Sequence, residues 1–132
     1  PRLLKGVVTE DGSVEEIETI LKNKVISEEA SRLLAEMLEG VVTEGSGKKA
    51  YIEGYKVGGK TGTAQKYEDG RIAAGKYVSS FIGFFPSDDP QYLALITVDE
   101  PQGTYYGSAV AAPAARAVFE DIIAIKNIQP YE

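Results

Sequence analysis

The hydrophobic positions of the chain follow two periods, and each period predicts a different kind of element. Over residues 30–41 apolar side chains recur every three or four positions, as they do along one face of a helix. Ser27 precedes this stretch, and Glu28 and Glu29 stand where acidic side chains favour a helix start. The pattern predicts a helix that begins after Ser27, ends before Gly45 and buries its apolar face.

Three later stretches have the character of strands. Residues 55–64 are expected to form the first strand, and Asp69-Gly70 marks a turn beyond its end. Residues 77–85 and 92–98 are two apolar runs separated by a short segment with a proline at each end. This spacing predicts that the two runs form an antiparallel hairpin.

The two ends of the chain complete the expected architecture. Residues 108–126 are rich in alanine and predict a second helix, with Pro113 near the first turn, where a missing amide hydrogen is tolerated. Residues 1–25 are interpreted as a hairpin or an irregular extended segment around the turn signal Asp11-Gly12. The order helix, three strands, helix predicts an α+β fold, in which both helices pack against a mostly antiparallel sheet.

Composition excludes several functions. The chain has 132 residues, of which 43% are hydrophobic, so it fits one domain or a large piece of one. Its 14 basic residues are outnumbered by 20 scattered acidic ones, which argues against nucleic acid and anionic membrane surfaces as partners. It has no histidine and no cysteine, so a histidine-based triad and a zinc site are excluded, and no metal or cofactor is predicted.

The sequence carries no recognisable targeting signal. No apolar run approaches the ~18 residues that would indicate a transmembrane helix. The chain starts at Pro1 without an initiator methionine or a charged and apolar leader, so we expect a processed or excised chain.

One segment matches a phosphate-binding loop. Residues 54–61 fit the Walker A pattern G-x-x-x-x-G-K-[ST] at every fixed position, and residues 93–100 offer a partner of the Walker B type. A phosphate loop needs a buried strand before it and a helix that starts at its Lys-Thr pair. Here residues 46–53 are too polar for a buried strand, and residues 62–64 are a poor helix start. A P-loop nucleotide-binding protein is therefore the alternative hypothesis, which the context disfavours.

A second segment matches the nucleophile motif S-x-x-K. Ser46-Gly47-Lys48-Lys49 fits the pattern literally. In that chemistry the serine lies at a helix N-terminus and the lysine, one turn later, takes its proton. Glycines on both sides of Ser46 make such a helix implausible, so the segment is interpreted as a solvated basic loop.

The third motif is Lys60-Thr61-Gly62-Thr63, expected on a strand at the open edge of the sheet. Side chains alternate along a strand, so Thr61 and Thr63 share one side while Gly62 faces the other and leaves room for close packing. Two hydroxyls on one side suit a carboxylate ligand, and Lys60 adds a cation. The unpaired amides of an edge strand can also polarise a substrate carbonyl as an oxyanion hole.

The sequence around this motif resembles class B penicillin-binding proteins, in which a Lys-Thr-Gly element is a known catalytic motif. Four ordered blocks carry the resemblance, and the stretch before them is similar as well: residues 54–65, 80–86, 98–101 and 108–113, preceded by residues 33–47. The resemblance covers roughly residues 1–127. It implies a partial penicillin-binding/β-lactamase-like transpeptidase fold, with residues 1–132 as the C-terminal part of the transpeptidase domain.

The resemblance also implies a function for the parent protein. The parent would be a D,D-transpeptidase that cross-links peptidoglycan stem peptides through an acyl-serine intermediate and is acylated by β-lactams. Lys60 would tune the electrostatics around the nucleophile, and Thr61 and Thr63 would bind the terminal carboxylate of a D-Ala-D-Ala donor. The amide of Thr63 would form half of the oxyanion hole, and Gly62 would keep the strand narrow. The parent would be anchored in the cytoplasmic membrane, with this domain on its outer face.

Two elements of the family pattern are missing. A helical S-x-x-K and an S-x-N are both absent, and Ser87-Asp88-Asp89 is the nearest approach to the second. These elements normally lie upstream of residue 1, so the chain alone is expected to be inactive and to need the upstream remainder of the domain. An unpaired strand edge or bare sheet face would also favour self-association. Tyr105 and Tyr106 could line the rim of the substrate groove or pack against the sheet.

Overall fold

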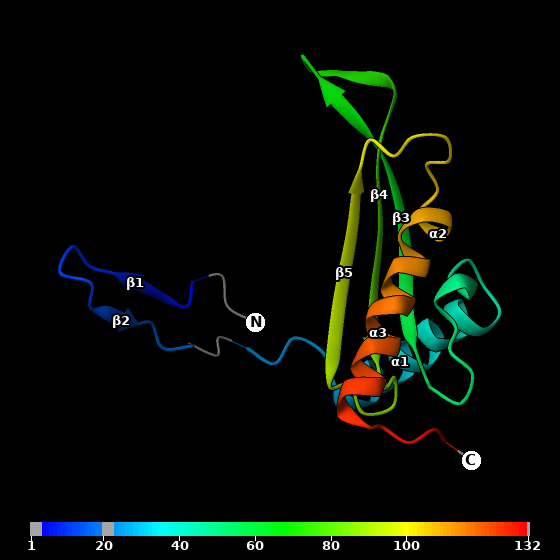
Figure 1. Cartoon of the computed structure of the whole chain (residues 1–132), viewed down its shortest axis with the longest axis horizontal. Coiled ribbons are helices and arrows are strands. Elements are labelled where there is room, and N and C mark those ends of the chain that lie inside the picture. Colours follow the sequence, from blue (N-terminus) through cyan, green and yellow to red (C-terminus); the bar gives the residue numbers. More distant parts are fainter. Residues whose placement is uncertain (1–3, 20–22, 132) are drawn as a thin grey trace.

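A computed structural model describes residues 4–19 and 23–131, and it has the predicted α+β architecture (Figure 1). The elements, in chain order, are β1 (Gly6–Val8), β2 (Val14–Glu16), α1 (Glu28–Thr43), the 3-10 helix η1 (Lys48–Ala50), β3 (Gly58–Glu68), β4 (Arg71–Phe85), β5 (Tyr92–Asp99), α2 (Gly107–Val110) and α3 (Ala112–Lys126). Residues 1–3, 20–22 and 132, which belong to the domain part expected over residues 1–132, lie outside the described residues. Among the described residues, no helix is both long and apolar enough to cross a membrane.

The hairpin expected near the N-terminus is present within residues 6–16. β1 and β2 pair antiparallel, and Gly12 has a φ of 83°, which glycine adopts at little cost. Hydrogen bonds from Thr9 and Ser13 to the Asp11 side chain close the turn and lower the pKa of Asp11 to about 2. The hairpin lies apart from the main sheet (Figure 1).

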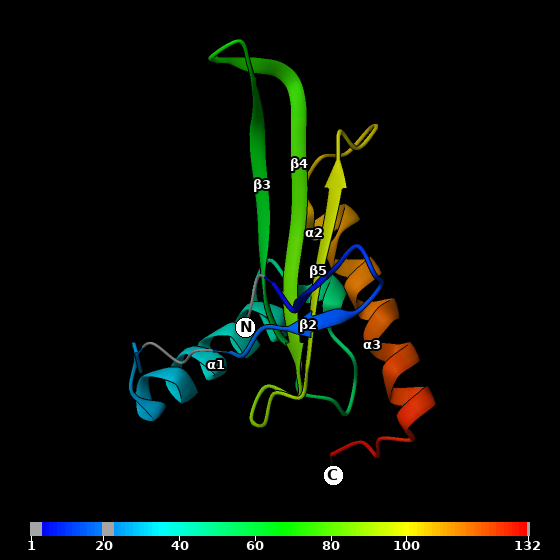
Figure 2. The same ribbon diagram turned by 90° about the vertical axis from the view of Figure 1, so that its left-hand side faces the viewer.

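The main sheet has the order β3-β4-β5, with both pairs antiparallel. The predicted turn at Asp69-Gly70 is confirmed, and both residues have positive φ. β3 and β4 extend further toward this turn than predicted, because residues 65–76 are too polar to give a hydrophobic strand signal. Past the end of β5 the two strands continue as a two-stranded arm (Figure 2).

The core lies between the sheet and α3. Phe81, Phe85 and Phe119 are fully buried, and the rings of Phe85 and Phe119 are 6.0 Å apart. Phe81 and Phe85, four positions apart on β4, lie on the same face of the sheet, as the two-residue period of a strand requires. The second helix was predicted as one element over residues 108–126, whereas the structure divides it at Ala111 into α2 and α3.

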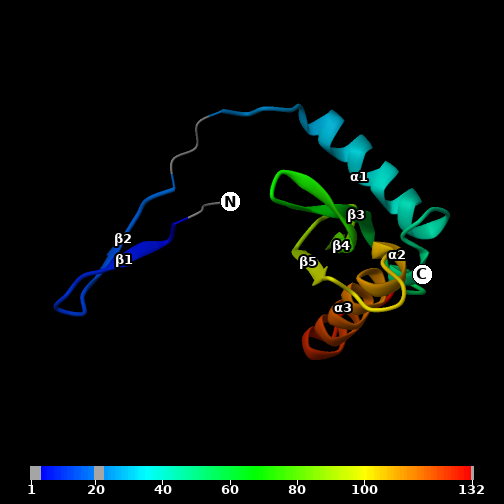
Figure 3. The same ribbon diagram turned by 90° about the horizontal axis from the view of Figure 1, so that it is seen from above.

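The start of α1 is confirmed, but the expected burial of its apolar face is wrong for this chain. The Ser27 hydroxyl accepts a hydrogen bond from the amide of Ala30 at 3.1 Å, as an N-cap residue does. Leu34 and Met37, however, are 50% and 59% exposed, and in α1 only Val42 is buried. Only the C-terminal end of α1 meets the sheet, while the rest of the helix runs away from it (Figure 3).

A second apolar surface lies on the sheet face opposite α3. Leu93 and Leu95 are 70% and 64% exposed there. Between this face and α1 runs a groove of about 350 Å³ lined mainly by apolar side chains, among them Leu34, Phe84 and Tyr92. Two apolar surfaces of one chain thus face each other across the groove.

The segment after α3 returns to the start of β3. The amide of Tyr131 donates a hydrogen bond to the carbonyl of Gly54 at 2.8 Å, and the Tyr55 hydroxyl donates to the carbonyl of Ile128 at 3.0 Å. The Tyr131 hydroxyl also donates to Asp88 at 3.0 Å. These bonds hold residues 128–131, which we call the C-terminal clasp, against the loop that leads into β3.

Candidate functional site

The four residues Lys60 to Thr63 lie in extended backbone at the edge of the sheet. β3 pairs with β4, and in the described part of the chain no strand pairs with its other side. The expected edge strand is therefore confirmed. A phosphate loop would need a helix to begin at Thr61, so the P-loop alternative is rejected.

The alternation of side chains along β3 is also as predicted. Thr61 and Thr63 stand opposite Phe81 and Ser79, which are both buried on the face toward α3. Gly62 points to the other face, where a Cβ would come within 2.5 Å of the Ser80 hydroxyl oxygen. Glycine at this position thus lets β3 and β4 approach closely.

The side chain of Lys60 folds along the open edge. Its Nζ is 2.9 Å from the carbonyl oxygen of Thr61 and 3.4 Å from the Thr61 hydroxyl oxygen. The first contact indicates that this carbonyl faces the open edge. The amide and carbonyl of one residue in an antiparallel strand point the same way, and so do those two positions later. The backbone amide of Thr63 therefore also points to the open edge of β3.

The hydroxyl of Thr63 is held by the start of α2. The amide of Gly107 donates to the Thr63 hydroxyl oxygen at 3.1 Å. A hydroxyl has one proton to donate, so accepting this bond leaves the Thr63 proton available for another acceptor. Gly107 is buried, and a Cβ there would collide with the carbonyl oxygens of Gly62 and Ser80. Sequence reasoning did not identify Gly107, because its role depends on a contact between distant segments.

Ser46, which the sequence placed in a solvated loop, also contacts the motif, and this contact was not predicted. Its hydroxyl oxygen is 3.1 Å from that of Thr61, fifteen positions later. Ser46 does not begin a helix of the S-x-x-K kind, since α1 ends at Thr43 and only the short η1 follows. Lys48 and Lys49 are exposed, so the interpretation as a solvated loop is correct for them and incomplete for Ser46.

Three tyrosines stack beside the loop that leads into α2. The rings of Tyr77 and Tyr105 are parallel with centroids 4.0 Å apart, and Tyr106 leans on Tyr105 at 4.6 Å. The hydrogen bond between the hydroxyls of Tyr105 and Tyr106 is the main cause that raises the pKa of Tyr105 to about 12. The Ser79 hydroxyl donates to the Tyr105 carbonyl. Tyr105 therefore packs against the sheet, whereas Tyr106 remains exposed.

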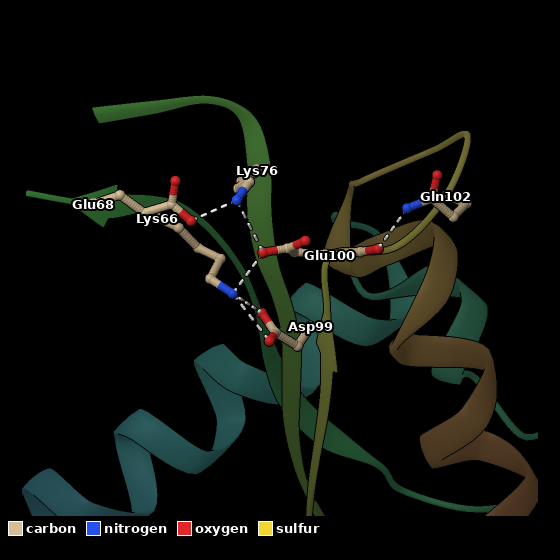
Figure 4. A network of polar contacts seen from close by, with 6 residues as sticks. All are labelled: Lys66, Glu68, Lys76, Asp99, Glu100 and Gln102. Atoms are coloured by element: carbon tan, nitrogen blue, oxygen red, sulfur yellow. Dashed lines mark hydrogen bonds and ion pairs between the residues drawn. The ribbon is translucent and has the colours of Figure 1, made fainter. Parts of the chain in front are cut away.

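Above the motif, a network of charges joins the two-stranded arm to the end of β5 (Figure 4). Lys66 contacts Asp99 and Glu100 at 2.9 and 2.8 Å, and Lys76 contacts Glu68 at 2.5 Å. The hydrogen bonds from Lys66 to Glu100 and Asp99 raise the pKa of Lys66 to about 12. The network fixes the base of the arm where it leaves the sheet.

Taken together, these residues place several polar groups along one open strand edge. A cation, two hydroxyls and an outward-facing amide gather on a few residues of β3, which suits a ligand with both a carboxylate and a reactive carbonyl. Within residues 4–19 and 23–131 no group of three acidic, histidine or cysteine side chains is arranged to hold a metal ion.

Comparison with known proteins gives consistent matches. The family model described as penicillin binding protein transpeptidase domain matches residues 1–120. Stage V sporulation protein D of Bacillus subtilis (strain 168) is 46% identical over 112 residues, which are 84% of this chain and 17% of that protein. A peptidoglycan D,D-transpeptidase FtsI homolog of Chlorokybus atmophyticus is 42% identical over 109 residues, which are 81% of this chain and 16% of that protein.

A solved structure matches as well. Penicillin binding protein 3 from Mycobacterium tuberculosis, complexed with ampicillin, superposes with a TM-score of 0.75 at 26% identity, covering 97% of this chain and 31% of that one. The chain spans less than a fifth of the length of the two relatives named above.

Proposed function

Because the chain belongs to the transpeptidase domain family of the class B penicillin-binding proteins, we propose that it is the C-terminal part of a D,D-transpeptidase domain. The parent protein cross-links peptidoglycan stem peptides through an acyl-serine intermediate. The single observation that carries this proposal is the open edge of β3, where Lys60 and the two threonine hydroxyls lie beside an outward-facing amide. A cation, hydroxyls and an amide are the groups needed to bind an acyl donor through its carboxylate and its carbonyl.

Each residue of the motif has a role in this proposal. Thr61 and Thr63 bind the terminal carboxylate of the D-Ala-D-Ala donor or of a β-lactam, and Lys60 tunes the electrostatics of the proton network around the nucleophile. The amide of Thr63 donates to the oxyanion, a contact whose loss typically costs about 2.7–4 kcal/mol of transition-state stabilisation. Gly62 keeps the strand slim enough for the donor to lie alongside.

The nucleophile is supplied by another part of the domain. The helical S-x-x-K and the S-x-N of this family have no counterpart in the 132 residues, so the isolated chain lacks acylation chemistry. We propose that the remainder of the domain covers the exposed faces of α1 and the sheet. Two apolar surfaces flanking a groove of about 350 Å³ support this, since exposed patches of this kind mark interfaces. Without that remainder, the same surfaces favour self-association of the chain.

We extend the proposal to the setting of the parent protein. Peptidoglycan lies outside the cytoplasmic membrane, so in this proposal the domain works on the outer face, and the parent protein is anchored in that membrane. β-Lactams are expected ligands of the complete domain, and the structural relative complexed with ampicillin supports this.

A fluorescent penicillin tests the proposal. The full-length protein that contains this chain should be labelled covalently, while the isolated chain should stay unlabelled. Replacing the amide of interest is not possible by mutation, so Lys60→Met serves as the site variant and Lys49→Met as its control on the exposed loop. K60M should reduce labelling strongly and K49M should not. Labelling of the isolated chain at Ser46, or no labelling of the full-length protein, would contradict the proposal.

A further inference from the structure

Ser46 is fixed beside the motif strand by a folded-back segment after α1. The amide of Gly45 donates to the carbonyl of Gly40 at 3.2 Å, and the amide of Gly47 donates to that of Val41 at 2.9 Å. A Cβ on Gly45 would come within 2.9 Å of the Val41 carbonyl oxygen, so the close return of the chain suits glycine there. The backbone on both sides of Ser46 is thus tied to the helix, and its exposed side chain reaches β3.

The hydroxyl of Ser46 meets the motif at Thr61. The two hydroxyl oxygens are 3.1 Å apart, a hydrogen bond in which either group can donate. Lys60 Nζ approaches the same Thr61 oxygen at 3.4 Å, and an ammonium group can only donate. Thr61 therefore lies between a cation and a second hydroxyl.

The hydrogen bond between Ser46 and Thr61 leaves one hydroxyl proton of the pair for a ligand. Each hydroxyl has one proton, and the bond between Ser46 and Thr61 uses one of the two. Whichever group donates, the other keeps its proton for an acceptor outside the pair. The Lys60 contact strengthens this donor, because a hydroxyl that accepts from a cation is polarised.

We propose that Ser46 is a positioning residue for the carboxylate-binding site of the donor, acting through the hydroxyl of Thr61. This inference rests on the function proposed above. Ser46 holds the Thr61 hydroxyl in one orientation, so that the Ser46–Thr61 pair and Thr63 each present one proton toward the same anion. The group recognised is the free carboxylate at the end of a peptide donor, or the equivalent carboxylate of a β-lactam.

The test compares two variants of the same shape in the full-length protein. Ser46→Thr keeps the hydroxyl and adds a methyl group, and Ser46→Val has nearly the same shape as that threonine but carries a second methyl group in place of the hydroxyl. The substrate is a peptide ending in D-Ala-D-Ala, and the release of D-Ala gives kcat and KM separately. S46V should raise KM about tenfold with kcat within about twofold, as expected for a lost hydrogen bond to a charged ligand. S46T should keep both constants within about twofold.

A nearby hydroxyl serves as the control. Thr43 ends α1, is exposed, and donates to the carbonyl of Glu39 at 3.2 Å, away from the motif. Thr43→Val should change neither constant. An unchanged KM in S46V, or equal changes in S46V and S46T, would overturn the role of Ser46. A wild-type protein that releases no D-Ala would instead contradict the proposed function itself.

Discussion

Both long helices of the chain carry apolar side chains on one face, yet only α3 buries large side chains of that face in the core. α3 places Phe119 against the sheet with no exposed surface, whereas Leu34 and Met37 of α1 remain half exposed or more. The helical period of a sequence therefore predicts that one face will be buried, but not which polypeptide buries it. In this chain α3 has its partner in the same 132 residues, and α1 faces an apolar sheet surface across an open groove.

The largest loss of stability is expected when the buried side chain that holds α3 against the sheet is removed. Phe119→Ala leaves a cavity beside Phe85 and should destabilise the chain by about 3–5 kcal/mol, as measured by denaturant unfolding. Val118→Ala is the matched control on the same helix, because Val118 is partly exposed, and it should cost less than about 1 kcal/mol. Equal losses in the two variants would mean that the α3 face is not the main core.

The groove side provides the second test. Leu34→Ala should change the unfolding free energy of the isolated chain by less than about 1 kcal/mol, since half of its side chain already meets solvent. In the full-length protein the same substitution should cost about 2–5 kcal/mol, because the proposed remainder of the domain would bury it. A cost that is the same in both proteins would show that nothing covers α1.

A smaller effect is expected at the start of α1. Ser27→Ala removes the hydroxyl that accepts from the Ala30 amide, and should cost about 1 kcal/mol of local helix stability. Circular dichroism of the isolated chain should then report lower helicity. Ser31→Ala, inside the same helix, should leave helicity unchanged or raise it, because alanine favours helices. The reverse order of the two variants would contradict the capping role.

The smallest effect concerns the exposed arm, where charges replace apolar packing. The pKa of Lys66 is raised to about 12 in the folded chain from an ordinary value of 10.5. A raised pKa means that its contribution to stability is complete below about pH 10.5 and is lost as the pH rises through about 12. The Tm should therefore fall less steeply between pH 10 and 12 in Lys66→Met than in the wild type. Lys49→Met, on the exposed η1 turn, should keep the wild-type slope.

Much of the fold could be predicted because local signals coincide with the final structure. Ser27 caps α1, and Asp69-Gly70 forms the turn between β3 and β4. The length of the arm could not be predicted, since residues 65–76 pair through backbone bonds and a charge network rather than through buried side chains. The break at Ala111 was also missed, because an alanine-rich stretch gives no sign of where one helix yields to another.

The site was predictable in part for a related reason. The alternation of Thr61 and Thr63 follows from the strand period alone, and the structure has it. Ser46 and Gly107 join the motif only through tertiary contacts, over fifteen positions in one case and more than forty in the other. Local sequence patterns carry no information about such long-range contacts. The glycines around Ser46 therefore predicted a loop, but not that this loop contacts β3.

The C-terminal clasp has a practical consequence for anyone who shortens this protein. The family match ends at residue 120, within α3, so a version trimmed to that boundary would lose the last turns of the helix and the tail beyond it. The carbonyl of Gly54 would lose the amide of Tyr131, and the Tyr55 hydroxyl would lose its acceptor. The loop that leads into β3 would then lose the contacts that hold it in place. Weaker ligand binding by the trimmed protein would reflect the loss of the C-terminal clasp rather than the chemistry of Lys60 and its neighbours.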